Sequence, residues 1–453
     1  MRYAAALTLS LFAAMLAGCT ENVIIRPDFT ATEAPVCDYT GSTVSDECKS
    51  QSLEDHHDYL LGFVEFDDQG WFYEVGQMKR LLARLDVEAA RNDLIISVFV
   101  HGWKHNAAFC DANVGCFRES LKLLAAQELR HYPAHPRKVV GIYVGWRGLS
   151  NDGPALWENL SFYSRKSAAT HVALGSVREL FARLAAFQKT QNARTDAVHN
   201  TRLMILGHSF GGLIVYTAVA QALIASAATR DQDLVAPFAD LVVLVNPAFE
   251  ASRFEALHRI AANRDYPPGQ NPVFVAVTSK TDAATGKAFP IGRWANSMLE
   301  KYSSSSTHLA ADEKQANTRT IGHDERYHTH SLTLSKAYLP PPLGKPDNAA
   351  CGCPYANGIR AISDPTYEEE RTNLQRFNDT WLDAEFRRKP HWSREYLGGA
   401  LLTHDEGDPD NAFWVVSADG AIIDGHNDFY TPVFFSFLRE LYDDTLRKPP
   451  KAK

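Results

Sequence analysis

Residues 202–216 read RLMILGHSFGGLIVY, and this stretch decides the fold. Its first five residues have the apolar character and length of a strand, and its last four begin a helical run. Between them stands Gly207-His208-Ser209-Phe210-Gly211. Glycines two residues before and after a serine allow a strand and a helix to approach closely, and the sharp turn presents the serine hydroxyl above the sheet. The pattern predicts a nucleophilic Ser209 at the carboxyl end of a strand.

Other apolar runs of strand length alternate with helical stripes along the chain. Continuous apolar runs suit strands buried on both faces of a parallel sheet, and strands separated by helices imply parallel crossovers. The predicted strands are residues 94–100, 139–144, 202–206, 241–245, 273–277 and 413–416, and the predicted helices include 78–85, 177–184 and 434–441. Residues 60–66 and 71–75 flank Asp67-Asp68-Gln69-Gly70 and predict a hairpin. We expect one α/β domain over residues 56–448, with a mainly parallel central sheet flanked by helices.

The interval from about residue 283 to 410 breaks this rhythm. It is rich in serine, proline, histidine and charge, and its hydrophobic periodicity is weak. A long stretch of this kind inside a domain is more typical of an insertion than of a second core. We expect a large cap over one face of the sheet, placed before the last strand.

The serine turn and its context resemble the α/β-hydrolase family, and the resemblance covers most of residues 60–446. The family places one oxyanion-hole amide directly after the nucleophile, which is Phe210 in this chain. It places a second amide in the loop after an early strand, where this chain reads Val98-Phe99-Val100-His101-Gly102-Trp103. The resemblance therefore implies the backbone N–H of Trp103 as the second donor. We expect His101 to order this loop rather than to act as the base.

The family order of serine, acid and histidine implies the remaining catalytic residues. Asp282 follows the predicted strand 273–277, where the acid that orients the histidine belongs. His426 lies between the last strand-like segments and the closing helix, which is the family position for the base. The alternatives are Glu250 for the acid and His323, His328 and His330 for the base.

Together these residues imply acyl transfer from a small-molecule or lipid ester, by chemistry that needs no metal or cofactor. The same triad serves lipases, peptidases and acyltransferases, so these activities stay open, and a noncatalytic envelope-binding lipoprotein is the alternative from another class. Trp146, Trp157, Phe162 and Tyr163 line either an acyl or alcohol site or the core. With 46 Lys and Arg against 54 Asp and Glu, the net charge of −8 provides no basic field for nucleic acid.

The N-terminus has the order of an export signal. Arg2 precedes an apolar run over residues 4–16, and the run ends in Leu16-Ala17-Gly18-Cys19. This resembles a bacterial lipoprotein signal, in which residues 1–18 are removed and Cys19 is lipidated. Thr20 follows the cysteine, so the resemblance implies an anchor in the outer membrane of a Gram-negative bacterium. Residues 19–55 are polar and rich in threonine and acid, and we expect them to form a lipidated tether.

The six cysteines after Cys19 are Cys37, Cys48, Cys110, Cys116, Cys351 and Cys353. An even number in an exported chain predicts disulfides. Pairs of Cys37 with Cys48 and of Cys110 with Cys116 would close short loops. A direct bridge between Cys351 and Cys353 would close a very small strained ring, so we expect other partners for those two. Zinc held by Cys351, Cys353 and nearby histidines is the alternative, although a second ligand pair at finger-like spacing is missing.

Overall fold

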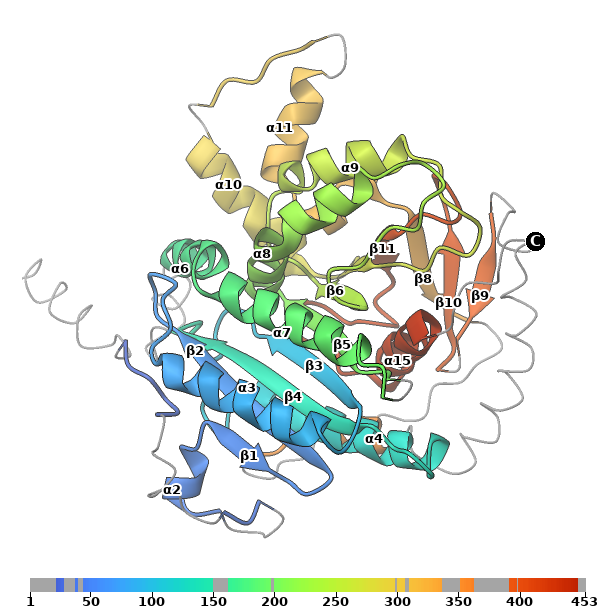
Figure 1. Cartoon of the computed structure of the whole chain (residues 1–453). Helices are drawn as coiled ribbons and strands as arrows, with labels where there is room; N and C mark the ends of the chain where they lie inside the picture. Colours follow the sequence, from blue (N-terminus) through green and yellow to red (C-terminus); the bar gives the residue numbers. More distant parts are fainter. Residues whose placement is uncertain are drawn as a thin grey trace, which may run out of the picture.

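The computed structural model is an α/β protein built on one mixed sheet, which is parallel for most of its width (Figure 1). It describes residues 22–27, 37–39, 44–149, 162–196, 199–297, 300–305, 309–335, 351–361, 391–396 and 398–446. The signal segment 1–18, Cys19 and Trp157 therefore lie outside the described residues, as does the side chain of Tyr163.

The sheet has 11 strands. In spatial order they are β1 (Leu53–Asp55), β2 (Tyr59–Phe66), β4 (Lys138–Trp146), β3 (Leu94–Val100), β5 (Arg202–His208), β6 (Leu241–Val245), β7 (Phe274–Ser279), β11 (Phe413–Ala418), β8 (His330–Leu334), β10 (Ala400–His404) and β9 (Ser393–Glu395). The strands from β2 through β8 in this order pair in parallel, whereas β1, β10 and β9 pair antiparallel. The predicted central strands are confirmed, and β3, β6, β7 and β11 are buried on both faces, as their continuous apolar runs predict.

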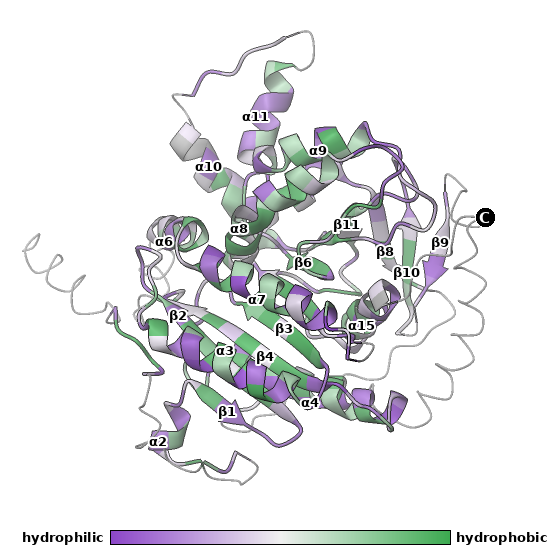
Figure 2. Cartoon of the chain, in the orientation of Figure 1, coloured by the Kyte–Doolittle hydropathy of each residue, from purple (hydrophilic) through white to green (hydrophobic). Residues whose placement is uncertain are grey.

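Helices cover both faces of the sheet. One face carries α3 (Val75–Ala89), α6 (Phe162–Leu174), α7 (Val177–Asn192), α8 (Phe210–Ala227) and α9 (Glu255–Ala262). The other carries α4 (Ala112–His131), α12 (Ala356–Ala361) and α15 (Pro432–Leu446). Figure 2 shows the apolar strands β3 and β4 beneath α3 and α7, whose exposed sides are mainly polar. The predicted helical stripes are therefore the core-facing sides of α3, α7 and α15.

Helix α8 is the one described helix long and apolar enough, by length and composition, to cross a membrane. It packs against the sheet between α6 and α9, as a core helix does. Short helical segments complete the described chain: α2 (Asp46–Lys49), η1 (Ala251–Arg253), η2 (Ala284–Ala288), α10 (Phe289–Ser297), α11 (Ala310–Thr318), η3 (Ile321–His323) and η4 (Glu325–Tyr327).

The predicted hairpin over residues 60–66 and 71–75 is wrong in its second strand. Residues 60–66 lie in β2, but the antiparallel neighbour of β2 is β1. After β2 the chain makes a turn in which the Asp67 side chain accepts from the amide of Trp71, and a single bridge joins Phe66 to Phe72 before α3 begins. Strand β1, which precedes β2 in the chain, pairs with the edge of β2 along which the second hairpin strand would have continued.

The described parts of the insertion at about 283–410 form three further strands of the sheet and a group of short helices. Its segments β8, β10 and β9 extend the central sheet beyond β11, so these residues add to the sheet instead of lying over its face. The earlier segments, η2, α10 and α11, stand beside α8 and α9 at the top of Figure 1. Short strands flanked by charge carry too little periodicity to be recognised from sequence.

Three disulfides join the described cysteines. The Cys37–Cys48 bridge is confirmed, with a Cα–Cα distance of 5.6 Å. The Cys110–Cys116 prediction is wrong, because Cys110 pairs with Cys351 and Cys116 pairs with Cys353. The Cys351-Gly352-Cys353 segment crosses the first turns of α4, where a Cβ on Gly115 would lie 2.7 Å from the carbonyl oxygen of Gly352. The sulfurs of Cys351 and Cys353 are each in a disulfide, so they are not thiolate ligands and the zinc alternative at these two cysteines does not hold.

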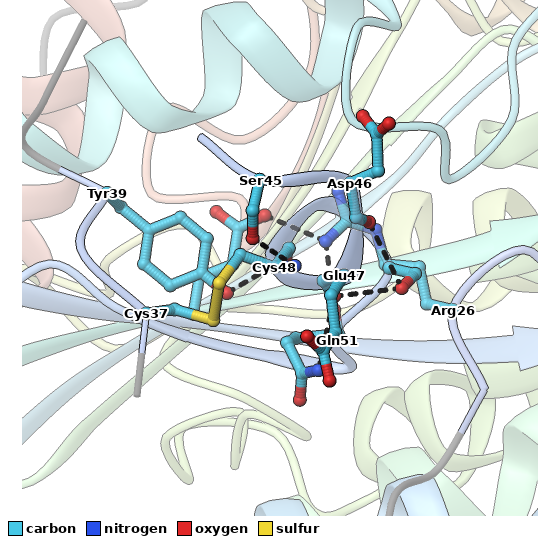
Figure 3. Close-up of a disulfide and its surroundings, with 10 residues drawn as sticks. Arg26, Cys37, Tyr39, Ser45, Asp46, Glu47, Cys48 and Gln51 are labelled. Carbon is cyan, nitrogen blue, oxygen red and sulfur yellow. Dashed lines mark hydrogen bonds and ion pairs between the residues drawn. A yellow bond between two sulfur atoms is a disulfide. The ribbon is translucent and has the colours of Figure 1, made fainter. Parts of the chain in front are cut away.

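The sheet and its packing begin before residue 56, inside the segment expected to be a tether. The Cys37–Cys48 bridge lies at α2, where the Tyr39 hydroxyl donates to the Cys48 carbonyl and the Ser45 hydroxyl accepts from the Cys48 amide (Figure 3). Strand β1 follows and pairs with β2. The described part of this segment is thus packed against the domain.

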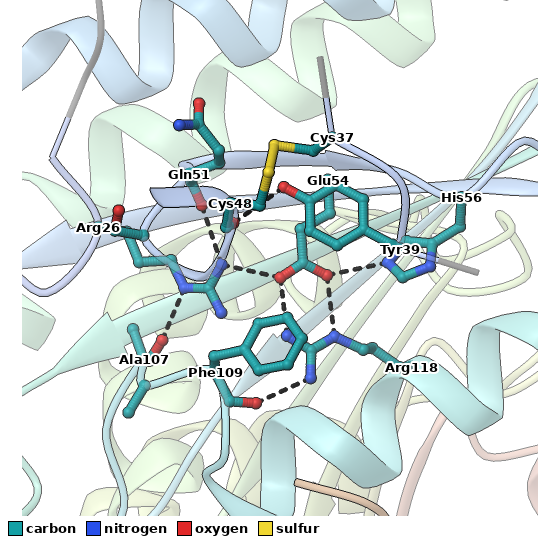
Figure 4. A network of polar contacts seen from close by, with 12 residues as sticks. Arg26, Cys37, Tyr39, Cys48, Gln51, Glu54, His56, Ala107, Phe109 and Arg118 are labelled. Atoms are coloured by element: carbon teal, nitrogen blue, oxygen red, sulfur yellow. Dashed lines mark hydrogen bonds and ion pairs between the residues drawn. A yellow bond between two sulfur atoms is a disulfide. The ribbon is translucent and has the colours of Figure 1, made fainter. Parts of the chain in front are cut away.

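Arg26 is the point at which the N-terminal segment enters the core. Its side chain is fully buried, and its guanidinium donates to the carbonyls of Ala107 and Gln51 and to the Glu54 carboxylate at 2.8 Å (Figure 4). Arg118 adds two hydrogen bonds to the same carboxylate, at 2.7 and 2.8 Å. Burial alone would raise the pKa of Glu54, but the charges of Arg118 and Arg26 outweigh it and hold that pKa well below its ordinary value.

We predict that Glu54→Gln destabilises the protein by about 3 to 5 kcal/mol, because it leaves two buried guanidinium groups without their carboxylate. The folded-state pKa of Glu54 lies below its unfolded value of about 4.3. The stabilisation is therefore fully present above that pH and is lost as pH falls toward the folded-state pKa. Urea unfolding at pH 7 and at pH 3 measures both effects. The exposed Glu47→Gln is the matched control, and equal losses in the two variants would contradict the role of Glu54.

Candidate active site

Ser209 occupies the turn between β5 and α8 in a strained backbone conformation. Its φ of 56° and ψ of −119° lie in a region that residues with a Cβ rarely adopt. The flanking glycines make the turn possible: a Cβ on Gly211 would lie 2.0 Å from the Val100 carbonyl oxygen, and one on Gly207 would lie 2.6 Å from that of Gly211. Strain held in place by such close packing is typical of functional turns.

The turn lies where the order of the sheet reverses. Strand β3 lies between β4 and β5 in the sheet. Along the chain β3 is followed first by β4 on one side of it and then by β5 on its other side. Open α/β sheets bind ligands at the carboxyl ends of their strands at such a switch point. Gly102 after β3 lies directly beside the serine, since a Cβ there would come within 2.8 Å of the Ser209 Cβ.

His426 and Asp282 reach Ser209 from later segments of the chain. The Nε2 atom of His426 lies 2.8 Å from the Ser209 Oγ, and its Nδ1 lies 2.8 Å from the Asp282 Oδ2. Because a carboxylate accepts, Nδ1 carries the proton and Nε2 is left to accept from the serine hydroxyl. Asp282 lies 73 positions after Ser209, and His426 lies 144 positions after Asp282. The three side chains nevertheless form one continuous chain of hydrogen bonds.

Asp282 is buried and held by four donors. Its Oδ1 accepts from the amides of Ala284 and Thr285, and its Oδ2 accepts from the Thr285 hydroxyl as well as from His426. Burial alone would raise the pKa of Asp282, but the hydrogen bond and charge of His426 and the bonds from Thr285 hold it below its ordinary value. The carboxylate therefore stays ionised and keeps the imidazole in one orientation.

The loop that carries His426 is fixed by residues from three strand ends. The His426 carbonyl accepts from the buried His208 Nε2 at 2.9 Å and from the Asn246 Nδ2 at 2.8 Å. The Ser279 hydroxyl donates to the Ile423 carbonyl at 2.6 Å. These bonds place the loop backbone, and hence the imidazole, over the end of β5. Burial lowers the pKa of His208 well below its ordinary value, so this ring is neutral and donates through Nε2–H.

The loop after β3 and the start of α8 flank Ser209. The amide of Phe210 is the first of α8, where no intrahelical acceptor exists. His101 orders the loop: its Nε2 accepts from the Trp146 amide at 3.1 Å, so its Nδ1–H donates to the Gly102 carbonyl at 2.9 Å. Burial lowers the pKa of His101 to about 4, which keeps it neutral. Trp103 follows in this loop, and its side chain is half-buried.

A group of aromatic rings, called here the aromatic wall, lies next to Ser209. Phe162 from α6 contacts the rings of Trp103, Phe210 and Phe289, with centroid distances of 5.5, 5.0 and 6.5 Å. Phe289 opens α10, so the insertion contributes to this wall. Trp146 instead lies in the core, where its ring stacks on His101 and its Nε1 donates to the His101 carbonyl.

The alternative residues lie elsewhere. Glu250 is enclosed by three cations, Lys166, Arg253 and Arg293. His328 contacts the Gly322 carbonyl, and His330 is buried among Trp392, His404 and Trp414. His323 reaches the site only indirectly, because its Nε2 lies 3.0 Å from the Thr285 hydroxyl that contacts Asp282. In the described part of the chain, no group of three or more His, Cys, Asp or Glu is arranged to hold a metal ion.

Sequence reasoning missed the supporting residues His208, Asn246 and Thr285. His208 stands inside the serine motif and Asn246 directly after β6, so their places at strand ends were readable. Their roles were not, because the carbonyl they support lies about 180 to 218 residues away. Asn246 adopts a φ of 46°, a strained conformation at the same edge of the sheet.

We predict that Asp282→Asn slows the reaction of Ser209 with a fluorophosphonate by about two to four orders of magnitude, because the amide no longer imposes the productive imidazole tautomer. The labelling rate, followed by intact-protein mass spectrometry, measures the effect. The exposed Asp424→Asn, two residues from His426, serves as the control and should label at the native rate. Similar rates for both variants would show that Asp282 does not orient His426.

No known family model matches this chain, and no curated protein matches it either. The chemistry of the site is therefore inferred from the arrangement of Ser209, His426 and Asp282 in the described fold.

Proposed function

We propose that this chain is a serine hydrolase with an α/β-hydrolase fold, and that it cleaves carboxylic esters through an acyl-enzyme intermediate. The observation that carries the proposal is the hydrogen-bonded chain from Ser209 Oγ through His426 to Asp282, at 2.8 Å in each link. Two further observations support it: the strained serine turn with its two glycines, and its location at the switch point of a parallel sheet.

The geometry supports a two-step mechanism. His426 Nε2 takes the hydroxyl proton as Ser209 Oγ attacks the ester carbonyl, and the backbone amides of Phe210 and Trp103 receive the developing oxyanion. The tetrahedral intermediate collapses, the C–O bond to the alcohol breaks, and the alcohol leaves with the proton held by His426. Water then attacks the acyl group with His426 again as the base, which releases the carboxylic acid and restores Ser209.

Polar support around His426 explains why this mechanism suits the site. An imidazole that gains and loses a proton in each step must keep its position, and the buried, ionised Asp282 stabilises the imidazolium that forms. The carbonyl bonds from His208 and Asn246 hold the loop without touching the ring nitrogens, which stay available for proton transfer. In the aromatic wall Phe210 and Phe289 are buried, and the half-buried Phe162 and Trp103 offer apolar surface beside Ser209 for an acyl or alcohol group.

We predict that a fluorophosphonate labels the protein only at Ser209, and that Ser209→Ala and His426→Ala lose both the label and the hydrolysis of p-nitrophenyl esters. Parallel assays with butyrate and palmitate esters compare a soluble with a lipid-like substrate and separate an esterase from a lipase by their rate ratio. The exposed His391→Ala, outside the triad, is the control for loss of a histidine. An unlabelled native protein with a normal circular dichroism spectrum would refute the hydrolase and favour a binding lipoprotein.

The proposal extends to location: Cys19 carries the lipid that anchors the chain to the outer membrane of a Gram-negative cell. The buried Arg26 lies seven positions after Cys19, and a fully extended chain over that interval spans at most about 25 Å. Because Arg26 is bonded inside the domain, the reach of the anchor is set by these few residues and not by the whole of residues 19–55. The domain is then held close to the membrane, by the face at which Arg26 enters.

We predict that Cys19→Ser moves the protein from the membrane fraction to the soluble fraction, because the acyl chains supply the attachment. Immunoblots of fractionated cells measure the distribution, with Cys37→Ser as the cysteine control. Retention of Cys19→Ser in the membrane fraction would contradict a lipid anchor at this position.

A further inference from the structure

An apolar cavity lies away from the triad of Ser209, His426 and Asp282. It has a volume of about 110 Å³ and lies between the sheet and the helices α4 and α15, on the face opposite α8. Its walls are mainly apolar, with Ile95 and Phe99 from β3, Leu206 from β5, Leu121 from α4 and Leu438 from α15. Apolar walls of this kind accept apolar ligands.

One end of this cavity holds polar groups that have no partner in the described chain. The Gln127 Nε2 and the Tyr442 hydroxyl are both buried without a hydrogen bond, and both residues line the cavity. Tyr442 lies near Arg137 and Asp240, so this is the end beneath the amino ends of β4 and β6. Buried donors without acceptors are rare in native proteins, because each carries an uncompensated desolvation penalty.

The chemistry of the two ends defines the ligand. The Gln127 amide nitrogen can only donate, and burial raises the pKa of Tyr442, so its hydroxyl keeps its proton and also donates. Arg439 also lines the cavity, and its guanidinium pairs with Asp443 at 4.0 Å. Two neighbouring donors call for a group with two acceptor oxygens, which a carboxylate provides, whereas the opposite end, with Phe99 and Phe429, calls for hydrocarbon.

We propose that this cavity binds an aliphatic carboxylate, with the carboxylate at Gln127 and Tyr442 and the chain directed toward Phe99 and Phe429. A cavity of about 150 Å³ holds a benzene ring, so this one holds roughly four carbons. It is partly open to solvent, which allows a longer chain to extend beyond it. The proposal does not depend on ester hydrolysis, since neither Ser209 nor His426 nor Asp282 lines the cavity.

The cavity nevertheless adjoins the loop of the triad histidine. Phe429 lines it, and the ring of Phe429 packs on His208 with a centroid distance of 4.6 Å. His208 in turn donates to the carbonyl of His426. The cavity and the triad are thus separate sites on the two sides of one packed histidine.

The test is calorimetric titration of the purified Ser209→Ala protein with sodium octanoate, with octyltrimethylammonium as the cation of equal chain length. We expect saturable one-to-one binding of octanoate and none of the cation. Leu124→Trp fills the cavity and should abolish binding, whereas Leu129→Trp, on the exposed side of the same helix, should not. Thermal unfolding of each variant reports whether it folds.

The Tyr442→Phe variant tests whether the Tyr442 hydroxyl binds the carboxylate or only fills space in the protein. Removal of the hydroxyl should weaken octanoate binding about tenfold, as loss of one hydrogen bond to a charged group does. It should at the same time leave the ligand-free protein as stable or more stable, because the buried hydroxyl has no partner there. Absence of saturable binding, equal binding by Leu124→Trp, or equal affinity in Tyr442→Phe would each overturn the assignment.

Discussion

The close approach of three backbone segments at the end of β5 is the constraint on which the site depends. Val100 at the end of β3, Gly207 at the end of β5 and Gly211 in the first turn of α8 leave no room for a side chain on either glycine. Ser209 is forced into a positive φ by this packing. The energy of that strain is supplied by the burial of β3, β5 and α8 in one core, so the whole sheet supports the position of a single hydroxyl.

Positioning of the triad histidine follows a different physical rule. Its loop lies outside regular secondary structure, and buried carbonyls in such a loop need donors. His208, Asn246 and Ser279 supply them from the ends of three adjacent strands. Parallel strands end at one edge of the sheet, so each strand can present a polar side chain to the same loop. Two independent sets of contacts therefore act on His426. Hydrogen bonds to its backbone carbonyl place the residue, and the hydrogen bond to Asp282 orients its ring.

Outside the sheet, charge and disulfides attach segments that have little apolar surface of their own. Arg26 and Glu54 hold the N-terminal segment to α4 through Arg118. The Cys116–Cys353 bridge holds part of the insertion to the same helix, and the Cys110–Cys351 bridge holds it to the loop before that helix. The pair with Cys116 spans 237 residues. Helix α4 and the loop before it therefore receive attachments from the N-terminal segment and from the insertion, while the inner side of α4 forms one wall of the apolar cavity.

Sequence by itself determined the central strands, the helices α3, α7 and α15, the Cys37–Cys48 bridge, and the residues Ser209, Asp282 and His426 that the structure brings together. Each of these leaves a local pattern: a continuous apolar run, a helical stripe, a short loop between cysteines, or a motif at a strand end. Only the tertiary structure decided the partner of β2, the pairing of Cys110 and Cys116, the sheet extension by β8 to β10, and the support of His426 by His208 and Asn246. These depend on contacts between residues far apart in the chain, and the side chains that make them are chosen by packing geometry, which local periodicity does not encode.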